Sequence, residues 1–204
     1  MILAVDTSGG ELVAVALDDE LRAAAGEVIA GRRHQERIVE VLERVFARAG
    51  GTRALTAVAV VRGPGSQAGL RVGLATAEGL AFARRLPLFP LASLDVAAHR
   101  AAGGGRVLAA VSAGRRNLHV QAFESNGQGW RPAGERALLA ADAVASRHAG
   151  LPVAGEPAVV EVLAAVGMHP VPGLCPGDQA LAAAARVAVT GGEGVAYDQL
   201  TGDY

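Results

Sequence analysis

Short apolar runs and polar breaks divide the start of the chain into strands. An apolar run at 2–5 ends in a polar turn at 6–10, and the alternating segment 11–17 follows it like a hairpin partner. A third extended run covers 21–30, and an amphipathic pattern at 35–49 predicts a helix. The chain therefore begins with three strands followed by a helix.

The next segments alternate between strand and helix. A β-type run at 56–62 leads into a helical pattern at 70–84, and one more strand and helix precede residue 102. Antiparallel hairpins that feed alternating units predict a mixed sheet with helices on its faces. The expected fold is α/β and two-lobed, of the actin/sugar-kinase or ribonuclease-H-like type.

The second half repeats this plan in shorter form. We expect strands at 106–111, 118–124, 129–136 and 152–154, an extended piece at 169–172, and helices at 138–149, 158–167 and 177–190. The predicted division is an N-terminal lobe at 1–102, a reduced C-terminal lobe at 106–190 and a mobile tail at 191–204. Glycines at 103–105 form the expected linker.

A glycine-rich elbow at 63–73 joins the predicted strand to the predicted helix. Pro64 stiffens the turn, and the Ser66 side chain can cap the helix. Such an elbow points backbone N–H groups at a helix N-terminus, where phosphate groups bind. Strand-to-helix turns also need glycine for geometry alone, so the elbow by itself is weak evidence for a function.

Composition limits which side chains can fill the core and which partners the chain can attract by charge. The chain of 204 residues is 51% hydrophobic but only 3% aromatic, so its interior must consist mainly of Ala, Val and Leu. A net charge of −1 provides no global field that would hold a polyanion. If tRNA is a ligand, we expect it to bind through a complex rather than to this chain alone.

A single cysteine and the absence of long apolar runs favour a cytoplasmic protein. Cys175 cannot form an internal disulfide, and we interpret it as an inert, buried thiol in a reducing compartment. The N-terminal sequence runs directly into a strand, and no run approaches the roughly 18 apolar residues that span a bilayer. We therefore expect neither a leader nor a membrane anchor.

Two enzyme classes that share this fold lack part of their usual chemistry. A two-metal nuclease needs converging carboxylates, but Asp6 has no evident partner and the strand before the elbow ends in Arg62. A kinase or ATPase needs two phosphate loops and a carboxylate. Residues 6–10 could form the first loop, but the second, at 112–116, has no acid and ends in Arg115 and Arg116. We interpret these arginines as exposed hairpin charges, and the Gly-Glu-Pro segment at 155–157 as too ordinary for an adenine site.

Metal-dependent and nucleophilic hydrolysis are also poorly supported. A helical metal pair requires histidines four residues apart, but Ile38 follows His34 at that spacing. The other histidines are equally isolated: His99, His119, His148 and His169. Ser66 has no His or acid near it in sequence, and its loop is not a Gly-x-Ser-x-Gly elbow.

A stripe of small residues suggests an interface instead. On the helix after the elbow, small residues recur every four positions and form a shallow ridge that could admit another helix: Gly69, Gly73, Ala77 and Ala81. The helix at 35–49 also carries a wide apolar stripe. Both helices could equally pack against their own sheet, and spacing alone does not decide between these alternatives.

Several segments occur in the order and spacing of a known family. They are Ile-Leu-Ala-Val-Asp-Thr-Ser at 2–8, His34, the elbow at 63–73, Leu86-Pro87 and Ser93-Leu94. In them the chain resembles the bacterial TsaB (YeaZ) family, an accessory partner in making threonylcarbamoyladenosine on tRNA. Gln67-Ala68 departs from the family's elbow, and Tyr197-Asp198-Gln199-Leu200 departs from its tail.

The resemblance implies a non-catalytic subunit that pairs with a TsaD-like transferase through the two helices, joined by a TsaE-like ATPase. A homodimer could form through the same surface, with no cofactor unless nucleotide binds at a complex interface. The implied interface residues are His34, Ile38, Leu42, Val45, Gly69, Gly73, Ala77 and Ala81. The implied remnants of phosphate loops are Asp6, Thr7, Ser8, Gly63, Gly65 and Ser66. A kinase or ATPase and a metallopeptidase-like protein remain as alternatives.

Overall fold

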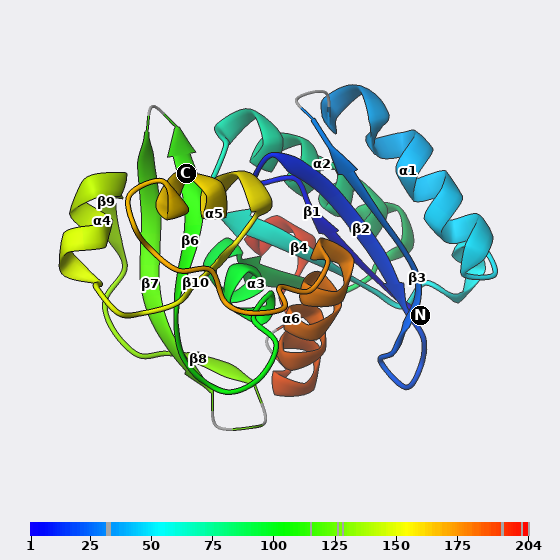
Figure 1. Ribbon diagram of the computed structural model, residues 1–204. Helices are drawn as coiled ribbons and strands as arrows, with labels where there is room; N and C mark the ends of the chain where they lie inside the picture. Colours follow the sequence, from blue (N-terminus) through cyan, green and yellow to red (C-terminus); the bar gives the residue numbers. More distant parts are fainter. Residues whose placement is uncertain are drawn as a thin grey trace.

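A computed structural model describes residues 1–31, 34–114, 116–125, 127, 129–192, 194–200 and 202–203, without the side chains at positions 34 and 35. Two mixed sheets lie side by side and are joined by a helix between them (Figure 1). This arrangement confirms the predicted two-lobed α/β fold. Within the described residues, no helix has both the length and the apolar character needed to cross a membrane.

The first sheet has the strand order β3-β2-β1-β4-β5. The strands are β1 (Ile2–Asp6), β2 (Glu11–Leu17), β3 (Ala23–Ala30), β4 (Ala57–Gly63) and β5 (Leu88–Ala92). The pairs β1–β2 and β2–β3 are antiparallel, whereas β1–β4 and β4–β5 are parallel. The predicted hairpin start and alternating continuation are therefore both confirmed.

Helices cover both faces of the first sheet. The helices α1 (His34–Arg48) and α2 (Gln67–Arg84) pack beside each other, α1 against β2 and β3 and α2 mainly against β4. A short 3₁₀ turn, η1 (Thr52–Ala54), precedes β4. The other face is covered by α6 (Gly177–Gly191), which lies in front of the sheet in Figure 1 while α2 lies behind it.

The second sheet has the order β10-β6-β7-β8, and β9 also pairs with β7. Its strands are β6 (Gly105–Gly114), β7 (Asn117–Ser125), β8 (Trp130–Pro132), β9 (Ala137–Ala140) and β10 (Val153–Gly155). Alternation along β6 gives it two apolar faces, because Leu108 packs with α4 (Ala141–Arg147) and α5 (Pro157–Ala164), while Val107 packs with α3 (Ser93–His99).

Two segments differ from the sequence-based expectation. Residues 138–140, predicted as the start of a helix, belong to β9 instead, because the exposed and less exposed positions of 137–140 alternate and pair with β7. The helix at 177–191, grouped by sequence with the second lobe, packs into the core of the first sheet through Ala180, Leu181 and Ala185. The uncovered face of the first sheet explains this placement, since its apolar side chains need a second layer.

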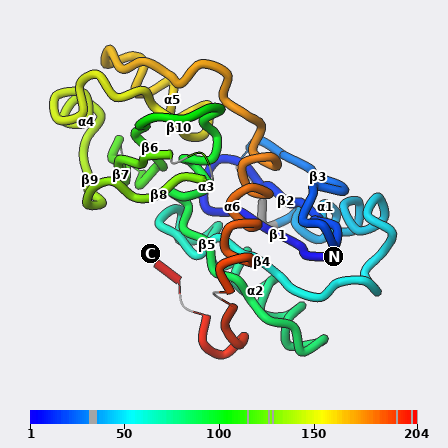
Figure 2. Tube along the Cα trace, turned by 90° about the horizontal axis from the view of Figure 1, so that it is seen from below, coloured from blue at the N-terminus to red at the C-terminus, as the bar shows by residue number. Residues whose placement is uncertain are grey.

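The described part of the tail contacts the first lobe. Val195 pairs with Leu88 at the edge of the first sheet, and Tyr197, in the 3₁₀ turn η2 (Tyr197–Gln199), packs edge-on against Phe82 of α2. Figure 2 shows this segment beside α2, beyond the end of α6. The Asp203 amide then donates to the Arg62 carbonyl over 2.7 Å, and the Asp203 carboxylate forms an ion pair with Arg136 of the second lobe.

Candidate functional site

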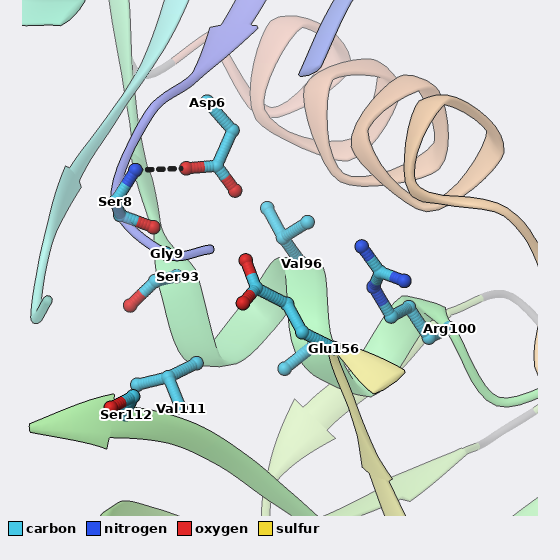
Figure 3. A pocket seen from close by; sticks show the side chains of 10 residues that line it. Asp6, Ser8, Gly9, Ser93, Val96, Arg100, Val111, Ser112 and Glu156 are labelled. Atoms are coloured by element: carbon cyan, nitrogen blue, oxygen red, sulfur yellow. Dashed lines mark hydrogen bonds between the residues drawn. The ribbon is translucent and has the colours of Figure 1, made fainter. Parts of the chain in front are cut away.

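The ends of several strands meet at a pocket between the two lobes. Asp6 ends β1, Ser112 lies near the end of β6, and Glu156 follows β10. Helix α3 contributes Ser93, Val96, Ala97 and Arg100 at its start, middle and C-cap, and the remaining lining residues are Ser8, Gly9 and Val111. The side chains converge from both sheets, as Figure 3 shows. Ligands of open α/β sheets bind at such carboxyl ends, so this pocket is the candidate site.

The turn after β1 and the glycine elbow after β4 lie next to each other because the two strands are parallel. The Ser66 amide donates to the Ser8 carbonyl over 2.8 Å, and the buried Thr7 hydroxyl donates to the Gly69 carbonyl over 2.7 Å. The Ser66 hydroxyl accepts from the Gly69 amide at 3.4 Å, which confirms the predicted helix cap. The two loops thus form one hydrogen-bonded unit at the edge of the pocket.

Asp6 is a buried residue at the end of β1, with a relative exposure of 8%. Burial raises its pKa above the ordinary carboxyl value, although the Ser8 amide, which donates to Oδ1 over 2.8 Å, opposes this shift. The residue closes its own turn, which agrees with the strand-end cap that the sequence also allowed. The Ser8 side chain is buried beside it, as is the Thr7 side chain.

Glu156 reaches this turn from the second lobe. Its Oε2 accepts a hydrogen bond from the Gly10 amide over 2.8 Å. Burial raises the pKa of the Glu156 carboxyl, the Gly10 amide lowers it, and the nearby charge of Asp6 raises it further. Sequence reasoning set the segment 155–157 aside as too ordinary for an adenine site, and it did not pair Glu156 with Gly10 because 146 positions separate them.

Arg100 lies beside these carboxylates but is already paired. It is 6% exposed and forms an ion pair with Glu11 of β2. Ser93, at the other end of α3, donates its hydroxyl to the Pro64 carbonyl over 2.5 Å and so ties the glycine elbow to the helix. Arg100 and Ser93 are therefore held by internal partners at the wall of the pocket.

The structure changes the interpretation of the small-residue stripe. Each of the stripe positions Gly69, Gly73, Ala77 and Ala81 is buried against the protomer's own sheet. A Cβ added at Gly69 would lie 1.9 Å from the Thr7 carbonyl oxygen, and one at Gly73 would lie 2.3 Å from Thr7 Oγ1. The predicted use of this stripe as a partner surface is therefore wrong. The small size of these residues allows α2 to approach the strands closely.

The same correction applies to the apolar stripe of α1. Ile38, Leu42 and Val45 are 5%, 6% and 0% exposed, because they pack in the core of the first sheet. The side chain of His34 lies outside the described residues. The surface of α1 and α2 that remains accessible is the opposite one, and it includes Val39 at 65% exposure and Phe82 at 64%.

Within the described part of the chain, the residues considered for metal binding do not gather into a site. Among the described residues, no group of three or more His, Cys, Asp and Glu side chains is placed to hold a metal ion. Arg116 is exposed in the turn between β6 and β7, as predicted, and Arg115 lies outside the described residues. The Cys175 thiol donates to the His99 carbonyl at 3.1 Å, and burial raises its pKa, which keeps the sulfur protonated and inert.

Comparison with known proteins identifies the family. The family model described as "TsaD: tRNA N6-adenosine threonylcarbamoyltransferase" matches residues 27–189. The structure of YeaZ from Pseudomonas aeruginosa superposes with a TM-score of 0.84 and 29% identity, covering 100% of this chain and 98% of that one. The chain belongs to the TsaB/YeaZ family.

Two curated TsaB proteins extend this comparison. Each is named "tRNA threonylcarbamoyladenosine biosynthesis protein TsaB". The protein from Haemophilus influenzae is 39% identical over 49% of this chain, and that from Escherichia coli is 31% identical over 72%. The matched parts cover 42% and 65% of those relatives' own lengths, which is less than two thirds in both cases.

The fold also occurs in a more distant protein. An activator of 2-hydroxyisocaproyl-CoA dehydratase from Clostridium difficile, solved with bound ADPNP, superposes with a TM-score of 0.54 at 12% identity, covering 93% of both chains. This likeness confirms the two-lobed architecture expected for TsaB/YeaZ proteins. It concerns the fold alone.

Proposed function

We propose that this chain is a non-catalytic accessory subunit in the synthesis of threonylcarbamoyladenosine on tRNA. The observation that carries the proposal is the match with a YeaZ structure over the whole of this chain and nearly the whole of that one. Curated relatives named for the same biosynthesis support it. The place of action would be the cytoplasm, where tRNA is modified.

The partner in this proposal is a TsaD-like transferase, which performs the threonylcarbamoyl transfer to N6 of adenosine. A TsaE-like ATPase would join the same assembly, and tRNA would bind through the complex. The net charge of −1 supports this last point, since the chain offers no general attraction for a polyanion. Any nucleotide would bind at a complex interface.

The partner surface would be the outward face of α1 and α2. Val39 is exposed on α1, and Ala75, Gly79 and Phe82 are exposed on α2. A Cβ added at Gly79 would meet no atom within 4 Å, so another helix could approach closely at this point. In the absence of the transferase, two copies of this chain could pair through the same face.

Copurification with a TsaD-like protein tests the surface. Val39→Arg and Gly79→Arg each place a charge on the proposed face without entering the core, and we expect both to abolish pairing. Val162→Arg is the matched control, because Val162 is 43% exposed on α5 of the second lobe. If the first two variants pair as well as the control, the proposed surface is wrong.

Reconstitution of tRNA modification tests the function itself. We expect threonylcarbamoyl transfer by the TsaD-like subunit to depend on this chain, and the isolated chain to show neither transfer nor hydrolysis of labelled ATP with Mg²⁺. Turnover of ATP by the isolated chain would favour the kinase or ATPase alternative. Unchanged modification without the chain would remove the accessory role.

A further inference from the structure

The carboxylate of Glu156 occupies the space above the turn that follows β1. Besides its 2.8 Å hydrogen bond from the Gly10 amide, it lies against Gly9. A Cβ built on Gly9 would come within 1.9 Å of Oε1 and 2.4 Å of the carboxyl carbon. The carboxylate of the second lobe therefore occupies the space that a side chain at position 9 would need. Figure 3 shows the Glu156 side chain extending from its own strand end toward this turn.

The position of Glu156 in the second lobe is well fixed. It caps α5, since its carbonyl accepts from the amides of Val159 and Val160 over 3.0 Å. Directly before it, Gly155 pairs with Ala110 of β6. The backbone at Glu156 is therefore fixed to the second sheet, while its carboxylate contacts the turn of the first lobe.

Charges of both signs surround Glu156, and the Gly10 amide donates to it directly. Asp6 and Glu11 repel the carboxylate, whereas Arg100, which forms an ion pair with Glu11, attracts it. A buried carboxylate needs hydrogen-bond donors to offset its desolvation. Backbone N–H groups of a glycine-rich turn are well suited to hold such an anion.

Helix α3 is the natural pivot for relative motion of the lobes. It contacts β4 and β5 of the first sheet as well as β6, β7 and β10 of the second, and its Leu94 and Ala98 lie in the cluster that includes Phe123 of the second sheet. Packed cores of this kind resist separation but allow small rotations about the shared helix. The contact between Glu156 and Gly10 lies at the pocket, to one side of this pivot.

We propose that Glu156 is an interlobe latch whose carboxylate, held by the Gly9–Gly10 turn, keeps the pocket between the lobes closed. The latch is a conformational device that adds to the proposed partner surface and does not depend on it. Release of the carboxylate rotates the second sheet away from the turn and opens the pocket. Closure requires an acceptor atom at this position rather than a negative charge.

Hydrogen exchange at the Gly10 amide tests the latch directly. Glu156→Ala is expected to speed exchange at Gly10 about fivefold, which corresponds to the loss of about 1 kcal/mol for one hydrogen bond. Glu156→Gln retains an acceptor oxygen and should keep exchange near the wild-type rate. Glu161→Ala removes an exposed glutamate from the same helix and is the matched control. Exchange in β1 and β6 shows whether each variant is folded.

The distance between the lobes provides a second measurement. Spin labels at Ala24→Cys and Ala143→Cys, which are exposed positions on β3 and α4, would be introduced together with Cys175→Ser. We expect one narrow distance distribution for the parent and for Glu156→Gln, and a shifted or broader one for Glu156→Ala. A folded Glu156→Ala variant with a parental distribution and a protected Gly10 amide would overturn the proposal. The proposal would also be overturned if Glu156→Gln changed the distance distribution and the Gly10 exchange rate as much as Glu156→Ala. That result would mean that the negative charge, and not the acceptor oxygen, holds the contact.

Discussion

Helix α2 presents small residues on two faces, one toward its own sheet and one toward solvent. The inward face carries Gly69 and Gly73, which are buried against Thr7. The outward face carries Ala75 and Gly79, which are exposed, and Gly79 has open space around it. Both sets repeat at helical spacing, so the two faces look alike in sequence. The difference teaches that a small-residue stripe permits close approach without specifying what approaches.

Among substitutions that test the two faces, Gly69→Ala should have the largest effect on the free energy of unfolding. The added Cβ would lie 1.9 Å from the carbonyl oxygen of Thr7, a backbone atom at the end of β1 that has little freedom to move. Overpacking of this kind in a core costs about 3 kcal/mol. Urea unfolding measures the loss. A loss below about 1 kcal/mol would mean that α2 can withdraw from the sheet, contrary to the tight inward packing described above.

Gly73→Ala should cost less, because its obstacle is a side-chain atom. The new Cβ would lie 2.3 Å from Thr7 Oγ1, but 3.6 Å from Thr7 Cβ. Relief requires the hydroxyl to leave its bond to the Gly69 carbonyl, at a cost of about 1–2 kcal/mol. In a Thr7→Ala background the obstacle is absent, so the same substitution should cost less there. A double-mutant cycle without coupling would contradict this explanation.

Asp6→Asn tests how the turn after β1, which packs against the inward face of α2, contributes to stability at different pH values. The folded-state pKa of Asp6 is raised by burial, so its contribution to stability is present at low pH and is lost as pH rises through that pKa. Asparagine can still accept from the Ser8 amide but carries no charge. The stability of the variant relative to wild type should therefore increase as pH rises from about 4 toward 7.

Asp18→Asn provides a control of opposite sign. The pKa of Asp18 is lowered, first by the Arg22 amide that donates to it. Its contribution is therefore present above the ordinary carboxyl pKa and is lost as pH falls, so the variant should lose stability relative to wild type as pH rises. Chemical denaturation across this pH range measures both differences. If the stability differences of both variants changed with pH in the same direction, burial would not be the cause that sets the pKa of Asp6.

Gly79→Ala should have the smallest effect, and in the opposite direction to the changes at Gly69 and Gly73. The outward face leaves room for a methyl group, and alanine favours an exposed helix interior by about 0.5–1 kcal/mol over glycine. The midpoint temperature of thermal unfolding should therefore rise slightly. Destabilisation would mean that the outward face is packed against part of the chain in solution.

Much of the architecture follows from local patterns. Alternation at 11–17 and the apolar run at 2–5 are sufficient to predict the first hairpin, because the side-chain period of a strand is visible over a few residues. The elbow and its Ser66 cap are equally local, since glycine and a capping hydroxyl act on their immediate neighbours. The resemblance of these segments to the TsaB/YeaZ family also comes from sequence alone.

Tertiary structure decided which surfaces meet. The burial of Gly69 and Ala77, the return of α6 to the first sheet, and the contact of Glu156 with Gly10 all join residues distant in the chain. A helix has the same periodicity whichever side faces the sheet, and a carboxylate after a strand has no local mark of its partner. These choices depend on the summed burial of many side chains, which is a property of the assembled layers rather than of any segment.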